Sequence, residues 1–467
     1  MSAGSRTSWS ALVATVLLAS AVVPAPARAQ VAPLRLADVL DAIARNPNFQ
    51  AAAAAVARAG GQELAANGAF DVRVRAGGEL FPVGYYERTL LDVEVRAPLR
   101  YSGITPFVGW RRGRGDFPIY DFKALTEEFG EIRGGIEMPV FRDRSIDRAR
   151  ADLSKAELAD DVARAELAQR VLELELMGTV AYWRWVAAGH RLRVREQQLQ
   201  LAVDRASGLQ RQIDQGTTPR IEATDNARVI AQREALVVAA RRDVTRTARE
   251  LSLFARDANG VPMAPTIERL PPLPAPEGPG AQTPPRPLPI LAALGFRLAT
   301  TAIDVDLAEN QLLPTFSVRA FAARGFGPFD PRIPDRAETS VGLGFVFELP
   351  LQQRQARGAL AIARADASRL RAEQRALTDR VNADLDVTAA ELEAALERST
   401  LLATTAQLAA ELADAERRKF AAGASTILVV NLREEAAADA AAGRIDAIAE
   451  YLEAHARHAV ARGNSPR

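Results

Sequence analysis

The sequence of 467 residues contains no cysteine, only three histidines and almost no net charge. Without cysteine the chain can form no disulfide framework, carry no lipidated cysteine and use no thiolate chemistry. Basic side chains number 59 and acidic ones 58, so electrostatics gives no reason to expect nucleic-acid binding. Because no nucleophile lies beside a histidine and no glycine-rich phosphate loop links a strand to a helix, we expect a protein that is not an enzyme and uses no cofactor.

The first 29 residues have the features of a secretory signal peptide. Arg6 precedes an apolar run at residues 11–23, and Ala27-Arg28-Ala29 supplies the small residues of a cleavage site. The apolar run is shorter than the roughly 20 residues that a spanning helix needs, so we expect a cleaved segment rather than an anchor. The mature chain then starts at Gln30, with 57 basic against 58 acidic side chains.

Two long stretches without proline, residues 142–214 and 352–420, dominate the rest of the chain. Small and apolar residues recur in both at alternating spacings of three and four, which is typical of a coiled coil. In the first stretch they are Leu167, Val171, Leu174, Gly178, Ala181, Trp185, Ala188 and Leu192, and in the second Leu385, Ala389, Leu392 and Leu396. At about 1.5 Å per residue, each helix would extend roughly 100 Å, too long for a compact domain.

The chain repeats one order of elements. A short segment, Glu137-Met138-Pro139-Val140 in one copy and Glu348-Leu349-Pro350-Leu351 in the other, leads into each long helix. Each helix then breaks at a glycine, Gly216 or Gly423, before a second helical segment. We therefore predict two repeats, each made of a helix, strands and a long helical hairpin.

The expected boundaries follow from this repeat. The first repeat covers residues 30–261 with a hairpin at 142–257, and the second covers 290–460 with a hairpin at 352–460. Eleven prolines within residues 262–289 predict an extended, helix-free linker between the two repeats. Residues 461–467 are expected to form a disordered tail.

Alternating apolar and polar residues predict strands within residues 71–140 and 315–350. Val93, Val95 and Ala97 alternate with polar neighbours, as do Phe345 and Phe347 with smaller ones. Strands of about 10 residues with one apolar and one polar face fit a membrane barrel. Residues 71–140 hold three or four candidate strands. An open sheet edge is not tolerated in lipid, so several subunits would have to pool their strands.

In this order the residues resemble the outer membrane factors of the TolC type, the trimeric channel-tunnels of Gram-negative efflux and type I secretion systems. The resemblance covers about residues 34–460. It rests on Ala44-Arg45-Asn46-Pro47, the segment 310–314, the two strands closed by proline and the two hairpins broken by glycine. It implies a mostly helical homotrimer in which each copy gives four strands to a twelve-stranded outer membrane barrel. A long helical tunnel would continue into the periplasm.

The resemblance also implies partners and a mechanism. The channel would be passive and would receive its cargo from an inner-membrane pump through a periplasmic adaptor, also called a membrane fusion protein. The cargo is whatever the pump delivers, whether drug, metal, polysaccharide or polypeptide. The hairpin tips are expected to dock the adaptor, and the residues concerned are Gly216, Thr217, Thr218, Gly423, Ala424 and Ser425. The alternative is that they are only well-formed turns, in which a glycine ends one helix and a threonine caps the next.

Acidic residues that follow the tip glycine narrow the tunnel in this family. Here Glu222 and Asp225 stand at those offsets from Gly216, and we expect them to form a constriction with Asn431 or Arg433 nearby. Carboxylates in a first helical turn are also common for electrostatic reasons alone, which is the competing explanation. The second repeat departs from the pattern, since the equivalent residues are apolar: Val429 and Leu432.

Other candidate sites have simpler explanations. His455 and His458 lie one helical turn apart without a nearby third ligand, so we expect no metal site there. Arg111, Arg112 and Arg114 alternate with glycines and suggest a solvated loop more than a lipopolysaccharide contact.

Two other classes of protein share some of these features. A periplasmic adaptor would have one hairpin flanked by β-rich domains, whereas this chain has two. A structural coiled coil would not need alternating strands that end at Pro139 and Pro350. A channel is therefore the favoured interpretation.

Overall fold

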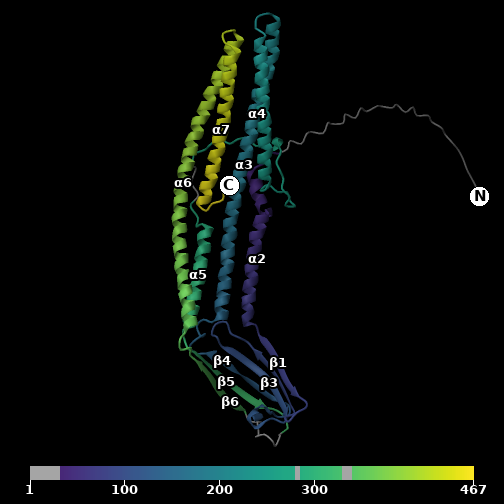
Figure 1. Ribbon diagram of the computed structural model, residues 1–467, viewed down its shortest axis with the longest axis vertical. Coiled ribbons are helices and arrows are strands. Elements are labelled where there is room, and N and C mark those ends of the chain that lie inside the picture. Colours follow the sequence, from purple (N-terminus) through teal and green to yellow (C-terminus); the bar gives the residue numbers. More distant parts are fainter. Residues whose placement is uncertain (1–31, 279–283, 329–338, 467) are drawn as a thin grey trace, which may run out of the picture.

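The structure is a computed structural model that describes residues 32–278, 284–328 and 339–466, except for the side chains of 121–123. The predicted signal peptide at residues 1–29 lies outside the described residues. The described chain is a long rod, with helices along most of its length and a β-sheet at one end (Figure 1). None of the helices in this described part is long and apolar enough to cross a bilayer.

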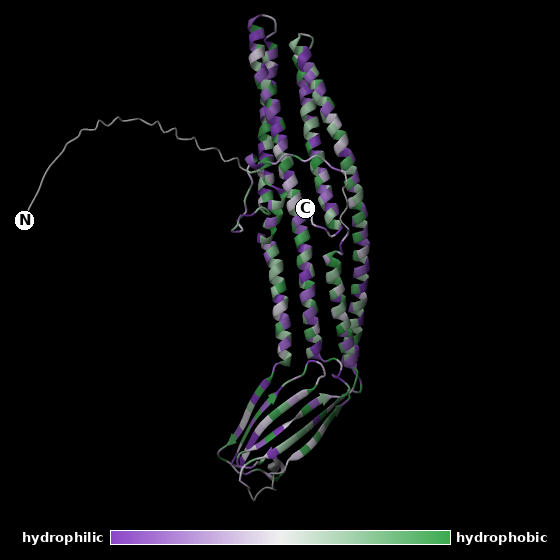
Figure 2. Ribbon diagram, turned by 180° about the vertical axis from the view of Figure 1, so that it is seen from behind, coloured by the Kyte–Doolittle hydropathy of each residue, from purple (hydrophilic) through white to green (hydrophobic). Residues whose placement is uncertain are grey.

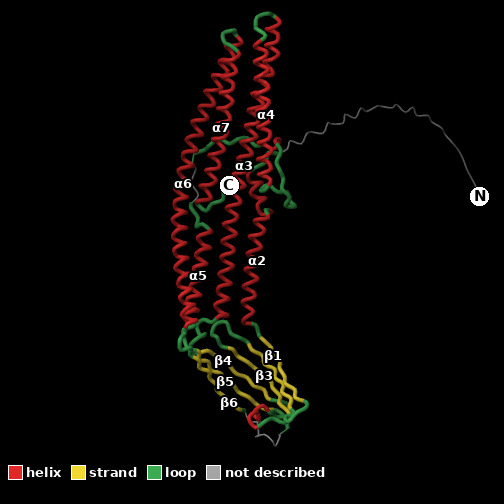
Figure 3. The backbone as a smooth tube through the Cα atoms, in the orientation of Figure 1, coloured by secondary structure: helices red, strands yellow, loops and turns green. Residues whose placement is uncertain are grey.

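Two continuous helices run from the sheet to the opposite end of the rod (Figure 3). They are α3, Arg148–Asp214, with 67 residues and α6, Arg354–Ala421, with 68. Both begin later than the expected 142 and 352, because each strand is first followed by a tight turn. Asp143 and Gln353 in these turns have positive φ angles of 67° and 50°, which a continuing helix cannot accommodate.

Four shorter helices pack along these two. Near the sheet they are α2, Pro47–Asn67, and α5, Pro289–Asn310; near the tips they are α4, Ile221–Ser252, and α7, Ile427–Ala461. A short helix α1, Leu36–Asp41, precedes them. Neighbouring helices follow the order α2–α3–α5–α6 beside the sheet and α4–α3–α7–α6 beside the tips. The rod is therefore four helices wide at both levels.

Most of the predicted helical seam is buried in α3: Leu174, Gly178, Trp185, Ala188 and Leu192 are buried, and Leu167, Val171 and Ala181 are half-buried. In α6 the predicted seam is only partly right. Leu392 is buried but Ala389 is exposed, because the buried stripe runs instead through the small residues Ala395 and Ser399. The approach of α7 to this side of α6 sets the stripe.

Six strands form one antiparallel sheet in sequence order. They are β1, Arg73–Phe81; β2, Arg88–Arg96; β3, Thr105–Gly115; β4, Glu131–Pro139; β5, Thr315–Gly325; and β6, Ser340–Glu348. The first repeat contributes four strands and the second two. The sheet therefore has two strands more than the four per copy expected for the barrel, because every candidate strand between residues 71 and 140 joins it.

Strand register separates the residues into two faces. Arg75 lies opposite Glu94 on one face, and Val74 lies opposite Val95 on the other. The polar face carries Arg73, Arg75, Glu79, Arg88, Asp92, Glu94, Arg96, Arg111, Glu131, Arg133, Glu137, Arg319 and Glu348. Across most of its length the other face carries Val, Leu, Ile, Phe and Trp side chains, with Arg112, Arg114 and Arg324 only near the end far from the helices. The resulting alternation of hydropathy along the strands is visible in Figure 2.

The linker between the repeats crosses the middle of the rod (Figure 1). The ring of His190 in α3 lies 2.9 Å from the carbonyl oxygen of Pro271, and Tyr451 in α7 donates a hydrogen bond to the carbonyl of Glu277. Leu270 packs so closely on Gly189 that a Cβ there would lie 2.5 Å from its side chain. The linker is not wholly free of helix, since Ile267–Arg269 forms one short 3-10 turn.

The C-terminal end departs from the expected disordered tail. Arg286 in the linker donates its backbone N–H to the carbonyl of Arg462 at 2.8 Å, and the Asn464 side chain donates to the carbonyl of Pro284 at 3.3 Å. Gly463, with a φ of 74°, turns the chain out of α7 toward these partners. Residues 462–466 are therefore packed against the linker.

Candidate functional site at the hairpin tips

The two hairpin tips have the same backbone geometry. Gly216 and Gly423 adopt left-handed φ angles of 74° and 75°. Each glycine N–H bonds to the carbonyl three residues earlier, and the next N–H, of Thr217 or Ala424, bonds back five residues. This pair of bonds is the Schellman motif, which satisfies the last carbonyls of a helix and favours glycine at its turning point.

The polar side chains at the tips bond back to the helices that they follow. Thr217 Oγ1 donates to the carbonyl of Gln212 at 2.9 Å, and Thr218 Oγ1 donates to its side-chain oxygen at 3.4 Å. Ser425 Oγ donates to Glu416 in the same way. The expected threonine cap on the following helix is absent at both tips, since neither α4 nor α7 has a side-chain cap bond. Most of the six predicted docking residues are exposed, Thr218 and Ser425 being half-buried.

The four predicted constriction residues do not form one cluster. Glu222 lies half-buried in the first turn of α4, and Asp225 pairs with Arg228 on the same helix at 2.9 Å. Arg433 on α7 is exposed. Asn431, also on α7, is buried and accepts a hydrogen bond at 2.7 Å from Arg205 of α3. It therefore joins the two hairpins.

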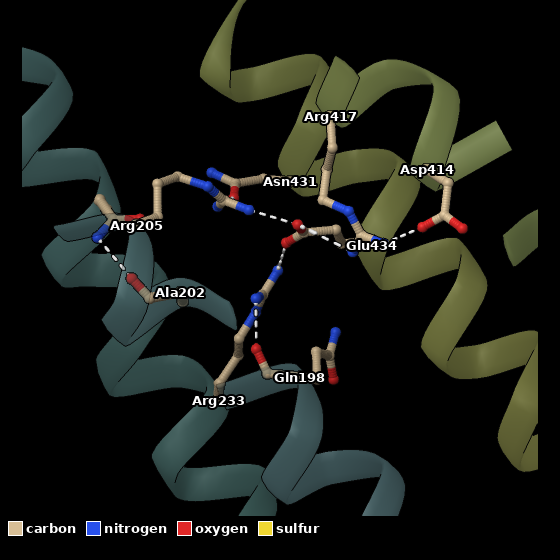
Figure 4. A network of polar contacts seen from close by, with 9 residues as sticks. Gln198, Ala202, Arg205, Arg233, Asp414, Arg417, Asn431 and Glu434 are labelled. Carbon is tan, nitrogen blue, oxygen red and sulfur yellow. Dashed lines mark hydrogen bonds and ion pairs between the residues drawn. The ribbon is translucent and has the colours of Figure 1, made fainter. Parts of the chain in front are cut away.

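A buried carboxylate that the sequence did not reveal, Glu434, lies at the centre of this contact (Figure 4). Glu434 on α7 accepts a hydrogen bond from Arg205 of α3, and another at 3.0 Å from Arg233 of α4. Arg417 of α6 approaches the same carboxylate at 3.7 Å and also pairs with Asp414. All four helices near the tips thus meet at one side chain.

Burial makes this network different from an ordinary surface ion pair. The side chain of Glu434 is 1% exposed and that of Arg233 is 4% exposed. Arg233 also donates to the carbonyl of Gln198 at 2.6 Å. Burial lowers the pKa of Arg233 from its usual value, although the hydrogen bond to Glu434 opposes this shift. Removing one partner of such a pair leaves an uncompensated buried charge, which is costly.

The network lies next to a cavity of about 450 Å³ between the hairpins. Its lining includes Gln198 and Leu201 from α3, Ala413 and Arg417 from α6 and Glu434 from α7. Asn431 Nδ2 and Asn226 Oδ1 in this region are buried without a hydrogen-bond partner among the described residues. Packing around the network is therefore incomplete.

Further ion pairs follow the same contact between α3 and α7 toward the middle of the rod. Arg195 pairs with Asp439 at 3.0 Å, and Arg191 pairs with Asp446. Closest to the middle of the rod, Arg184 pairs with Glu453 at 3.2 Å. In every case α3 supplies the arginine and α7 the carboxylate. We call these pairs, together with Arg205 and Glu434, the α3–α7 ionic seam.

One sequence signal could have identified Glu434. Ile427, Asn431, Glu434 and Ala438 follow the alternating spacing of a buried helical stripe, and all four are buried. A carboxylate on such a stripe needs a cationic partner, because an isolated buried charge is strongly unfavourable. The two arginines that donate hydrogen bonds to it, Arg205 and Arg233, lie more than 200 residues away in the sequence, so spacing alone could not name them.

Asn310 fixes the junction between β4 and α3. Its buried side-chain oxygen accepts a hydrogen bond at 2.9 Å from the N–H of Asp143, in the turn that follows β4. Pro139 is the last residue of β4, whereas Pro350 lies just beyond β6. Gln353 donates to the carbonyl of Leu312 at 2.9 Å and ties the second junction to the end of α5.

No family model matches the sequence, and no curated protein matches it either. Solved outer membrane channels match the structure over most of its length. The open state of the MtrE channel of Neisseria gonorrhoeae has a TM-score of 0.63 at 14% identity, covering 93% of this chain and 90% of that one.

Two further solved channels match the structure to a similar extent. The CmeC channel of Campylobacter jejuni has a TM-score of 0.62 at 10% identity, covering 92% of this chain and 85% of that one. The VceC protein of Vibrio cholerae has a TM-score of 0.61 at 15% identity, covering 92% and 97%. These matches confirm, at the level of the fold, the resemblance to outer membrane factors: the chain has the fold of these outer membrane channels.

Proposed function

We propose that this protein is the outer membrane channel of a Gram-negative export system and acts as a homotrimer. The observation that carries the proposal is the sheet, which has one apolar face, one polar face and two open edges, and which continues directly into a wall of helices. Such a sheet can lie in lipid only when other copies pair with its edges. The polar face would then line a pore, and the helices would extend it through the periplasm.

The proposed partners would meet the channel at the tips. They lie farthest from the sheet, where a periplasmic adaptor would meet the channel and couple it to an inner-membrane pump. Exposed apolar side chains beside the tip turns, Ile221, Leu428 and Leu432, favour contact with such a partner. The channel performs no chemistry and uses no cofactor, so the pump selects the cargo and supplies the energy.

The α3–α7 ionic seam supports a role in closing the periplasmic end. For this end to widen, the hairpin of α6 and α7 has to move away from the hairpin of α3 and α4. Such a movement would break the contacts of Glu434 with Arg205 and Arg233 and expose three charged groups to water. Because charged groups regain hydration when exposed, a polar contact of this kind can open reversibly where an apolar core would resist.

Membrane fractionation tests the proposal. We expect the protein in the outer membrane fraction and, after detergent extraction, as a trimer that forms ion-conducting channels in planar bilayers. Recovery as a soluble periplasmic protein would refute it. In the same bilayers, Glu222→Ala combined with Asp225→Ala is expected to reduce cation selectivity and block by multivalent cations, and unchanged behaviour would exclude these carboxylates from the constriction.

A further inference from the structure

The sheet ends in two edge strands of equal length. β1 and β6 each have nine residues, and almost all of their side chains are exposed. Neither has a second neighbour among the described residues. β1 runs away from the helices and β6 runs back toward them, so the two edges are suited to antiparallel pairing between copies.

Like the other strands of the sheet, β1 and β2 have one apolar face and one polar face. In β1, Val74 and Leu80 lie on the apolar face, whereas Arg75 and Glu79 lie on the polar face. β1 and β2 are paired along their full lengths, from Arg73 to Phe81. A hairpin outside the membrane would have no need of a continuous apolar face.

Ion pairs on the polar face attach β2 to the strands of both repeats. The Glu94 carboxylate in β2 is buried and lies 3.4 Å from Arg133 in β4 and 3.4 Å from Arg319 in β5. Arg96, two residues along β2, pairs with the same carboxylate and lies 3.5 Å from Glu137 in β4. β2 is therefore a structural part of the wall that β4 and β5 form.

The width of the sheet also matches the helices that it joins. The four helices α2, α3, α5 and α6, packed about 8–10 Å apart, occupy about 32–40 Å of circumference. Six strands about 4.8 Å apart and tilted by about 40° occupy about 38 Å, whereas four would occupy only about 25 Å. The six-stranded sheet and the layer of four helices therefore have about the same width where they join.

We propose that β1 of one copy pairs antiparallel with β6 of the next, so that every copy contributes six strands and the trimer closes a barrel of eighteen strands. This rests on the proposed trimeric channel. Because barrel diameter grows with strand number, the pore is wider than a twelve-stranded barrel allows. Its wall carries the alternating arginines and carboxylates of the polar face, and an even number of strands per copy keeps every neighbouring pair antiparallel.

Cross-linking between copies tests the edge pairing, and the absence of native cysteine gives a clean background. Gly344→Cys places a thiol on the polar face of β6, at a position where a Cβ meets nothing within 4 Å. It is combined in turn with Arg75→Cys, Gly77→Cys or Glu79→Cys in β1. A short bismaleimide is then added to intact membranes, and covalent trimers are scored on denaturing gels.

The matched controls carry Gly344→Cys with Thr105→Cys or Arg111→Cys in β3, which would form the edge if only four strands entered the wall. We expect covalent trimers from the β1 pairs and monomers from the β3 pairs. Covalent trimers from the β3 pairs, or monomers from every pair, in a protein that is still a membrane trimer would overturn the eighteen-stranded barrel and leave the channel intact. A protein that is not a membrane trimer would overturn the proposed function itself.

Discussion

Arg233 in the first hairpin donates a hydrogen bond to Glu434 in the second at 3.0 Å, with both side chains almost completely removed from water. The two residues are 201 positions apart, and each belongs to a helix that begins at a different tip. Arg205 and Arg417 complete the charge environment of the carboxylate. The stability of the contact between the hairpins therefore depends strongly on one side chain.

Glu434→Gln is expected to weaken the contact between the hairpins. It leaves the buried guanidinium groups of Arg205 and Arg233 without a counter-charge, which costs about 3–5 kcal/mol for a broken buried pair. The free energy of unfolding in urea gives the loss, and single-channel conductance shows whether the periplasmic end opens more often.

The control for this variant is Glu435→Gln, which changes an exposed carboxylate on the same helix. Surface substitutions of this kind alter stability by about 0.5 kcal/mol or less. Equal losses in the two variants would show that Glu434 has no special role between the hairpins.

Gly423→Ala is expected to destabilise the second tip through its backbone alone. A Cβ at this position meets nothing within 4 Å, but the φ angle of 75° lies in the left-handed region. The cost for a residue with a Cβ there is about 1–2 kcal/mol. Urea unfolding of the helical part measures it.

Gly208→Ala, inside α3, is expected to change stability in the opposite direction. A Cβ there also meets nothing within 4 Å, yet the glycine is helical. Replacing a glycine in a helix interior with alanine stabilises it by about 0.5–1 kcal/mol. If both substitutions changed stability in the same direction, the left-handed turn would not explain the glycine at the tip.

Asn310→Ala is expected to loosen the junction between the sheet and the helices. The N–H of Asp143 loses its buried acceptor, and an unsatisfied buried group costs about 1–3 kcal/mol. Hydrogen exchange of the turn at residues 140–147 should increase relative to the wild type. Gln311→Ala, at the neighbouring position, is the control and should leave this exchange unchanged.

The contact between His190 and the linker is expected to make the stability of the protein depend on pH. Burial lowers the pKa of His190 relative to the unfolded chain, so the folded state favours the neutral ring that contacts the carbonyl of Pro271. The stabilisation is present above the unfolded pKa of about 6.5 and is lost as the pH falls below it. The loss of unfolding free energy from about pH 8 to pH 5 should be smaller in His190→Gln than in the wild type, and an equal loss would contradict the prediction.

Regular local patterns allowed much of the fold to be predicted. The absence of proline and the alternating three- and four-residue spacing of apolar residues predict α3 and α6. A coiled-coil stripe depends only on residues in neighbouring turns of one helix, so it can be found in the sequence. Gly216 and Gly423 mark both tips, since the left-handed turn has a strong residue preference. Alternation of apolar and polar side chains likewise locates the strands around Val93 and Phe345.

Pairing over long distances was decided only by the tertiary structure. Alternation shows that a segment is a strand but not which sheet it joins, so only the register showed that the first repeat gives four strands to the same sheet. Glu434 appears in the sequence as one of many helical carboxylates, and the arginines that donate hydrogen bonds to it, Arg205 and Arg233, lie in the other hairpin. The sequence by itself determined the rods, their turns and the two faces of the strands through local geometry. The six-stranded wall and the buried contact between the hairpins needed the folded chain, because both bring together residues that are far apart in sequence.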